Sequence, residues 1–208
     1  MKRKTPRSKP PPRRRTQAER SETTTRALVS AAHRLFATRG FAATPIEDIL
    51  AAAGIARGGL YHHFASKTEL FRAVFEEQEK LLMAAVGTAT DGRQDAWGAF
   101  RVGCDAFLDA CLDPAVQRII LMDAPSVIGW EAMREIESRY ALALLEGGLE
   151  RAMRAGKLSK RPVRPLAHLL LGALSESAMA IARAPRPAAA MQASKREIAR
   201  LLAALAAT

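Results

Sequence analysis

The chain has 208 residues, of which 32 are Lys or Arg and 21 are Asp or Glu, so its net charge at neutral pH is +11. This length builds one domain or two small ones. The charged start is followed by prolines instead of an apolar run, which excludes a secretory signal, and no run of about 18 apolar residues could span a membrane. We therefore expect a soluble, cytoplasmic protein.

Residues 1–20 form a basic, proline-rich arm. They contain nine Lys or Arg, one Glu and four Pro, and so carry +8 of the net charge. Because they have almost no apolar side chains, they are predicted to be disordered. The arm either follows a DNA backbone or is a solvated tail, and the motif that comes after it favours the first interpretation.

A first helix is predicted from about Ser21 to Arg39, followed by Gly40, a residue suited to end it. Its apolar face consists of Leu28, Ala32, Leu35 and Phe36.

Two capping-box sequences frame the next segment. Thr44 and Glu47 can satisfy free amides at the start of one helix, and Ser66 and Glu69 repeat the pattern about twenty residues later. Gly54 lies between them and supplies a turn. This spacing predicts a helix, a turn and a short second helix, as in a helix-turn-helix motif.

The short helix after the turn carries side chains suited to DNA. Only the first residues of a recognition helix meet base edges in the major groove, and Arg57, which can grip a guanine through two hydrogen bonds, is among them. Gly58 and Gly59 each weaken a helix by about 1 kcal/mol relative to alanine, which suits a backbone that approaches phosphates closely. The alternative for Arg57 is a solvated surface arginine.

Further groups in this region are expected to fix the protein on phosphates. Tyr61 offers a hydroxyl, Lys67 a charge and Thr44 a second hydroxyl. One of His62 and His63 is expected to contact a phosphate or base while the other packs. Adjacent histidines on a helix point about 100° apart and no Cys or carboxylate cluster flanks them, so we expect no metal site.

The rest of the chain shows no strand pattern. After a helix over residues 67–86 and a linker over 87–93, further helices are predicted over about 94–112, 114–123, 129–155, 163–184 and 188–206. The fold class is therefore predicted to be all-α, with an N-terminal three-helix helix-turn-helix DNA-binding domain (21–66), a connecting helix (67–86) and a C-terminal helical ligand-binding and dimerisation domain (87–208).

The two cysteines, Cys104 and Cys111, lie seven residues apart on one predicted helix. At about 1.5 Å per residue their Cα atoms would be about 10 Å apart, too far for a disulfide. Buried reduced thiols are expected, with a redox sensor as the alternative.

The middle of the chain places aromatic and Met side chains on three predicted segments that could enclose one space. These are Trp97, Phe100, Phe107, Met122, Trp130, Met133 and Tyr140. Apolar cavities with a few polar anchors are the usual ligand sites, and Asp105, Asp109 or Asp123 could anchor a cationic group. The alternative is an ordinary core.

The last two predicted helices each carry an apolar stripe. The stripes are Leu166, Leu170, Ala173, Leu174, Ser177 and Ile181 in one helix and Ile198, Leu201, Leu202 and Leu205 in the other. Two such helices from each of two copies would close a four-helix bundle, and an intrachain core is the alternative.

Residues 20–70 are similar in order and spacing to the DNA-binding domain of the TetR family of bacterial transcriptional regulators. The similarity is carried by the runs Phe36 to Phe41, Thr44 to Ile49, Ala52 to Phe64 and Ser66 to Leu70. It implies a dimer formed through the last two helices and a ligand that binds in the middle and releases DNA. Ala56 departs from the hydroxyl residue that often begins the recognition helix, and Gly59 from a small side chain that reaches DNA.

The sequence thus predicts a regulator that binds double-stranded DNA as a homodimer at a pseudo-palindromic operator. We expect a repressor that responds to an unknown, largely apolar effector; the alternative is an architectural DNA-binding protein without an effector. No nucleophile–base pair, metal-ligand spacing or glycine-rich phosphate loop indicates an enzyme, and no cofactor is expected.

Overall fold

The computed structural model describes residues 16–206, which form helices and no strand. The elements are α1 (Gln17–Arg39), α2 (Ile46–Ala53), α3 (Arg57–His63), α4 (Lys67–Thr90), α5 (Ala96–Ala110), the π-helix η1 (Val116–Asp123), α6 (Ala124–Val127), α7 (Gly129–Arg139), α8 (Ala141–Arg154), α9 (Val163–Ala182) and α10 (Pro187–Ala206). The predicted all-α fold class is confirmed.

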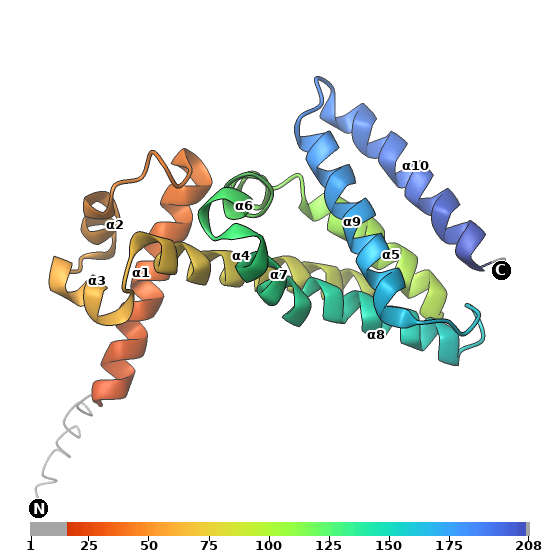
Figure 1. The fold of residues 1–208 in the computed structure, drawn as a ribbon, viewed down its shortest axis with the longest axis horizontal. Helices are drawn as coiled ribbons and strands as arrows, with labels where there is room; N and C mark the ends of the chain where they lie inside the picture. The colour runs from red at the N-terminus through yellow and green to blue at the C-terminus, as the bar shows by residue number, and fades with distance from the viewer. Residues whose placement is uncertain (1–15, 207–208) are drawn as a thin grey trace, which may run out of the picture.

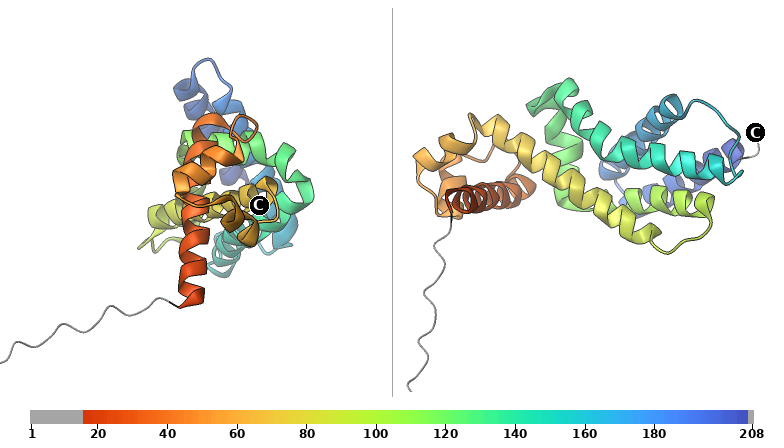
Figure 2. Two further views of the ribbon diagram at one scale, coloured as in Figure 1. Left: turned by 90° about the vertical axis from the view of Figure 1, so that its left-hand side faces the viewer. Right: turned by 90° about the horizontal axis from the view of Figure 1, so that it is seen from below.

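The molecule is elongated, with α1, α2 and α3 at one end and the later helices at the other (Figure 1). The long helix α4 begins beside α3 and runs into the larger body, where it packs along α5 and contacts η1 and α8. The right-hand view of Figure 2 shows the same separation, with α4 as the element that spans both parts. A movement of α4 would therefore be transmitted between the two ends.

A buried cluster of phenylalanines joins the start of α4 to the small N-terminal bundle. The ring of Phe36 in α1 lies 5.6 Å from that of Phe41 and 5.3 Å from that of Phe71 in α4. The rings of Phe41 and Phe71 are 5.3 Å apart and nearly perpendicular, an arrangement that aromatic pairs favour. The first turns of α4 are thus part of the N-terminal core, whereas we predicted a domain boundary before residue 67.

The helix α1 begins earlier than we predicted. Thr16 accepts a hydrogen bond from the Glu19 amide, and the Glu19 carboxylate accepts one from the Thr16 amide, which completes a capping box. Residues 17–20, assigned to the arm from the sequence, therefore belong to the helix. Residues 1–15 of the arm lie outside the described part of the chain.

Two other predicted boundaries are corrected. The helix expected over 129–155 is interrupted at Tyr140, whose φ of −119° and ψ of −83° are not helical, so α7 and α8 are separate. The linker expected over 87–93 is shorter, because α4 continues to Thr90. The segment predicted as a helix over 114–123 is the π-helix η1, which continues into α6.

The π-helix η1 is bonded to the end of α1. The Asp123 carboxylate accepts a hydrogen bond from the Phe41 amide at 2.7 Å, and the Arg118 guanidinium donates to the Arg39 carbonyl at 3.3 Å. Between them Gly40 has a φ of +78°, and a Cβ at this position would overlap the Arg118 side chain. The larger body is therefore attached to the N-terminal bundle at this point as well as through α4.

The helix α9 is long and apolar enough, by length and composition, to cross a membrane. Its apolar residues are instead explained by packing, because many are buried against neighbouring helices. The buried residues are Leu166, Ala167, Leu170, Leu171, Leu174, Ala178 and Ile181.

Both cysteines are buried and free, as predicted. Burial raises the pKa of the Cys104 thiol and of the Cys111 thiol to about 12, so both are protonated thiols at neutral pH.

Candidate nucleic-acid interface and ligand cavities

The turn between α2 and α3 has the geometry that the sequence predicts. Gly54 adopts a φ of +67°, in the left-handed region, and its amide bonds back to the end of α2. The Ile55 amide donates to the Leu50 carbonyl at 3.1 Å, so the helix end is closed by two backbone bonds. These bonds fix the direction in which α3 leaves the turn.

The helix α3 has one buried face and one exposed face. Leu60 is fully buried and Phe64, just after the helix, is buried too, so this side holds α3 on the bundle. Arg57, Tyr61 and His62 are exposed on the other side. In Figure 1 α3 lies at the outer end of the molecule, away from the C-terminal helices. Three of the residues that we predicted to contact DNA are thus exposed on this side of α3.

Arg57 is held loosely at the start of α3. Its guanidinium lies 3.4 Å from the carboxylate of Glu47 in α2, and both side chains are more than 60% exposed, at 67% and 62%. An exposed pair of this kind stabilises a protein by about 0–1 kcal/mol. Arg57 can therefore exchange Glu47 for a base or a phosphate at little cost.

The two glycines of α3 have different surroundings. A Cβ on Gly59 would lie 2.7 Å from Cγ2 of Ile55, so this glycine allows α3 to pack closely on the turn. A Cβ on Gly58 would meet no atom within 4 Å. Packing within the protein therefore explains Gly59 but not Gly58, which leaves Gly58 as the position where an approaching backbone could be accommodated.

Thr44 corrects one of our predictions. Its side chain is fully buried, and its hydroxyl donates to the Gly40 carbonyl at 2.7 Å. The N-cap of α2 is Pro45, with no side-chain cap bond, so the predicted box between Thr44 and Glu47 does not form. Burial also removes Thr44 from the set of direct phosphate contacts. At the second box, Ser66 caps α4 by accepting from the Glu69 amide, as expected.

Lys67 and the two histidines lie at the rim of α3. The Lys67 ammonium donates to the Phe41 carbonyl at 2.6 Å and lies over the Phe41 ring, and burial lowers the pKa of Lys67. His63 is partly buried, with Nδ1 3.3 Å from the Thr25 hydroxyl, whereas His62 is exposed. Of the two histidines, His63 is therefore the one that packs.

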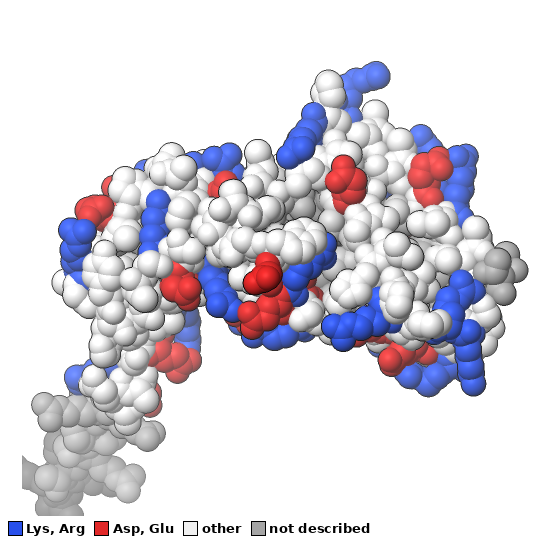
Figure 3. Space-filling model, viewed as in Figure 1, with Lys and Arg blue, Asp and Glu red and all other residues white. Residues whose placement is uncertain are grey.

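Basic residues are distributed unevenly along the chain. Figure 3 shows basic and acidic side chains interspersed on the face that it displays. Residues 1–15 contain eight Lys or Arg and no acid, so +8 of the total +11 lies there and residues 16–208 carry only +3. Most of the charge that would attract DNA is therefore on the arm.

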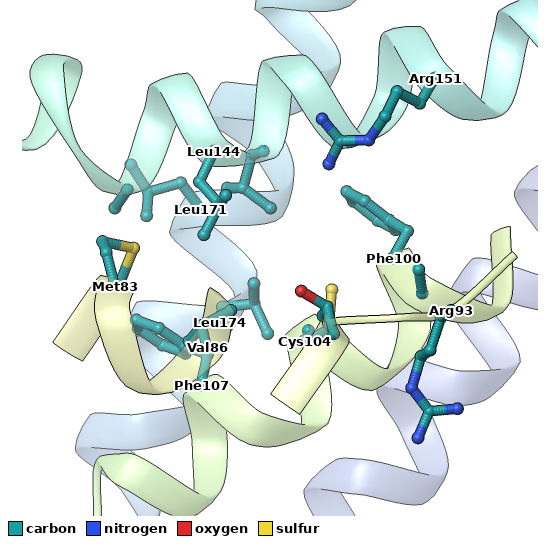
Figure 4. A pocket seen from close by; sticks show the side chains of 16 residues that line it. Met83, Val86, Arg93, Phe100, Cys104, Phe107, Leu144, Arg151, Leu171 and Leu174 are labelled. Carbon is teal, nitrogen blue, oxygen red and sulfur yellow. The ribbon is translucent and has the colours of Figure 1, made fainter. Parts of the chain in front are cut away.

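The aromatic residues of the middle segment line two cavities instead of one. The first has a volume of about 160 Å³ and lies among α4, α5, α8 and α9, with Phe100 and Phe107 in its wall. Trp97 stacks on Phe100, with ring centroids 5.3 Å apart. Arg93 and Arg151 lie on the Phe100 side of this cavity, across from Met83 (Figure 4).

The second cavity has a volume of about 300 Å³ and contains Phe107, Trp130 and Met133. Phe107, with Ala141 and Leu171, lines both cavities. Trp97, Met122 and Tyr140, which we predicted to line the ligand site, line neither cavity.

Two of the three predicted anchors form other contacts, and the sequence analysis did not identify the charged residues that line the cavities. Asp109 pairs with Lys195 at 2.5 Å, and Asp123 binds the end of α1. The charged residues that do line the cavities are Arg93 and Arg151 in the first and Glu79, Arg134, Glu137 and Glu176 in the second. A signal for Glu79 is present in the sequence, because this acid follows Phe75 by four residues and precedes Leu82 by three, on the apolar face of its helix.

Within residues 16–206 no group of three or more His, Cys, Asp or Glu side chains is placed to hold a metal ion.

Two family models match the chain. The model described as bacterial regulatory proteins, tetR family, matches residues 28–74, and the model described as the tetracyclin repressor-like C-terminal domain matches residues 97–205.

The chain belongs to the TetR family. Among solved structures, a TetR-family transcriptional regulator from Pectobacterium atrosepticum is 31% identical to it, with a TM-score of 0.80 and coverage of 93% of this chain and 99% of that one. The transposon Tn10 TetC protein of Escherichia coli is 27% identical over 75% of this chain and 79% of its own length. The regulator CymR of Pseudomonas putida is 46% identical over 31% of this chain and 32% of its own.

These matches make this TetR-family protein a DNA-binding transcriptional regulator with a helix-turn-helix motif. The tetR-family model reaches into α4, in agreement with the phenylalanine cluster that ties this helix to the N-terminal bundle.

The last two helices of this TetR-family chain also have an exposed apolar surface. Leu169 in α9 is 72% exposed and Leu201 in α10 is 43% exposed. Gly172, one turn after His168 on α9, is exposed too, so a neighbouring helix could approach closely. We call the surface formed by Leu169, Gly172 and Leu201 the α9–α10 face.

Proposed function

We propose that this regulator is a homodimeric, ligand-responsive repressor that binds a pseudo-palindromic operator. The observation that carries this proposal is the orientation of α3, which is anchored by Leu60 and presents Arg57, Tyr61 and His62 to the outside. A short helix fixed in this way can enter the major groove with its first residues against base edges. Its site of action would be the cytoplasm, where the DNA is.

In the proposed complex Arg57 specifies a base and the residues around it fix the register. Arg57 would leave Glu47 and donate two hydrogen bonds to one guanine. Tyr61, His62 and Lys67 would contact phosphates, and Gly58 would let the backbone come close. Lys67 is already held by the Phe41 carbonyl, which limits the freedom that it loses on binding.

We place the dimer contact on the α9–α10 face. A Leu that is 72% exposed at the middle of a helix is an unfavourable solvent contact, and a second copy would cover it. Operator half-sites about 34–36 Å apart, or a multiple of this distance, require two recognition helices held by one rigid contact.

The first cavity is the proposed site of an effector. Most of its wall is apolar, and Arg93 and Arg151 offer two positive charges on one side, so an apolar molecule with an anionic group fits best. Met83 and Val86 of α4 line this cavity, while Leu70 and Phe71 of the same helix belong to the N-terminal core. An effector that displaces α4 would change the distance between the two recognition helices, with a coupling of about 1–3 kcal/mol.

To test whether the protein recognises a specific DNA sequence, duplexes that it binds are first selected from a random pool. The variant Arg57→Ala is then compared with the wild type on the selected operator and on its single base-pair variants. We expect a loss of about 1–3 kcal/mol that is confined to one base position in each half-site. Arg101→Ala, which removes the same charge from an exposed position on α5, serves as the matched control and should leave the preference unchanged.

Two results would contradict this proposal. If Arg57→Ala weakens binding equally on all sequences, Arg57 contacts only phosphates. If selection from the random pool enriches no sequence, the protein is an architectural DNA binder instead.

A further inference from the structure

The second cavity contains a buried carboxylate that the proposed DNA contacts and the first cavity do not use. Glu79 lies in the middle of α4 and is only 2% exposed. Its Oε2 atom is buried and has no hydrogen-bond partner among the described residues. A buried acceptor without a partner is costly, at about 1–3 kcal/mol and more for a charged group, so its presence calls for a functional explanation.

The charges around Glu79 leave it uncompensated. On α7 the Arg134 guanidinium donates to the Glu137 carboxylate at 2.9 Å, so this arginine is already paired. From α9 the cavity receives Glu176, and from the end of α5 the Cys111 thiol. The lining residues Ile120 and Leu121 of η1 are apolar. The cavity therefore holds three carboxylates and one cation.

The walls suit an organic ion better than a metal ion. Phe107 provides an aromatic ring, and Leu82, Met133 and Met179 provide further apolar surface. The Trp130 ring already faces the Arg134 guanidinium, whose Cζ lies 4.1 Å from the ring centroid. Glu79 is the inner acid, and Trp130, at 61% exposure, marks the side that opens to solvent. Aromatic rings attract organic cations through their faces, and the attraction is stronger where water is excluded.

We propose that this second cavity binds a monovalent lipophilic cation, an arylalkyl ammonium ion in chemical class, whose charge is neutralised by Glu79. The apolar part of the ion would lie against Phe107 and Met133, with its cationic end toward Oε2 of Glu79. The proposal does not depend on the DNA contacts or on an effector in the first cavity.

Cation binding should be linked to proton release. Burial, and then the neighbouring Glu137, raise the pKa of Glu79 to about 8, so Glu79 is mostly protonated in the empty cavity at pH 7. A cation prefers the ionised carboxylate and must displace this proton. The affinity should therefore increase about tenfold between pH 7 and pH 9. The Cys111 thiol, with a pKa of about 12, stays protonated over most of this range.

The test uses the full chain, without DNA, and benzyltrimethylammonium, an ion whose charge does not change with pH. Calorimetric titration at pH 7 and pH 9 should show binding by the wild type, tighter at pH 9. Glu79→Gln should bind at least tenfold more weakly at pH 9 and lose the pH dependence. Neopentylbenzene, which has carbon in place of the nitrogen, is the neutral probe. Its binding should depend neither on pH nor on the Glu79→Gln substitution.

Two variants act as controls. Glu176→Gln removes the same charge from the exposed rim of the same cavity and should change the affinity less than threefold. Leu144→Trp fills the first cavity, which alone contains Leu144, and should leave binding of the cation unchanged.

Several results would overturn the proposal. The proposal fails if the wild type does not bind the cation at pH 9, or if its affinity does not change with pH. It also fails if Glu79→Gln binds the cation as tightly as the wild type, or if the wild type binds the neutral probe as tightly as the cation. Loss of binding in Leu144→Trp would place the cation in the first cavity instead. The pH dependence and the neutral probe need no variant, so the proposal stays testable even if Glu79→Gln does not fold. Failure here would leave the operator selection unaffected.

Discussion

Glu79 has a carboxyl group whose proton is retained by the folded protein over a pH range in which the unfolded chain has lost it. Its pKa is about 8 in the folded state against an ordinary value of 4.5. The stability that this group contributes is therefore full below about pH 4.5 and is lost as the pH rises toward 8.

Glu79→Gln should remove this loss of stability, because the amide resembles the protonated acid and does not ionise. We expect urea unfolding at pH 5.5 and pH 8 to show that the free energy of unfolding of the variant rises relative to that of the wild type. The relative increase between these pH values should be about 2 kcal/mol or more, since one pKa unit corresponds to about 1.4 kcal/mol. Glu176→Gln, at an exposed position, should unfold in parallel with the wild type. Parallel curves for Glu79→Gln would contradict the raised pKa.

Residue positions on a regular helix could be predicted because helical spacing decides which side chain faces the core. Arg57 and Tyr61 were expected to face outward toward DNA, and both are exposed. Thr44 could not be placed in this way. Its hydroxyl had two possible partners, a free amide of α2 and the Gly40 carbonyl, and the path of the loop decides between them.

At the scale of elements, the contact between η1 and the end of α1 links the two parts of the molecule. The Asp123 carboxylate accepts the Phe41 amide, and a hydrogen bond to a charged acceptor typically contributes about 1.5–3 kcal/mol. Because η1 also lines the second cavity through Ile120 and Leu121, it is a second connection, beside α4, from a cavity to the DNA-binding end.

Asp123→Ala should loosen this connection without unfolding either part. Loss of the bond should speed hydrogen exchange of the Phe41 amide by about tenfold to a hundredfold, as expected for about 1.5–3 kcal/mol. Exchange within α9 should not change. Asp91→Ala, at the exposed end of α4, is the matched control, and an unchanged rate at Phe41 in Asp123→Ala would show that the bond does not protect this amide.

The helices themselves were predictable, but some of their ends were not. Prolines and glycines marked the limits of α9 and the end of α8. The interruption at Tyr140 has no such mark, and the apolar spacing on its two sides suggested one helix. Tyr140 instead bonds to Glu76 of α4 at 2.6 Å, a contact between residues distant in the sequence. The π-helix η1 likewise has no glycine or proline of its own to announce it.

At the scale of the whole molecule, the net charge is distributed unevenly along the chain. Residues 1–15 carry +8, whereas all the remaining residues together carry +3. Attraction to DNA over a distance should therefore depend on the arm, and recognition of sequence on α3.

Deletion of residues 1–15 should lower the slope of log K against log salt concentration. Each lost phosphate contact reduces the slope by about 0.9 for duplex DNA. Fluorescence anisotropy on the selected operator between 50 and 200 mM salt would measure it, and the preferred sequence should be the same for both proteins. An unchanged slope would mean that the arm is a solvated tail.

Dimer formation can be tested at Leu169. Leu169→Glu places a charge on the α9–α10 face and should shift the protein from dimer to monomer in sedimentation experiments. Leu81→Glu is a matched control, because Leu81 is 51% exposed on α4, outside that face. A monomeric wild type, or a dimer that survives Leu169→Glu, would exclude this face.

The separation into two cavities could not have been predicted from the sequence. Seven side chains were expected to share one space, but which of them meet depends on how α9 and η1 pack across α5. The packing divides Phe100 from Trp130 and leaves Met122 on the surface at 49% exposure.

The side chains of Phe107, Ala141 and Leu171 form a partition with a chamber on either side. Protein interiors are packed too tightly for such a partition to yield toward one chamber without enlarging or shrinking the other. A ligand that fits within one chamber would leave this partition in place, whereas one large enough to press on it would narrow the other chamber. The size of a bound molecule would therefore determine whether the two chambers act separately or together.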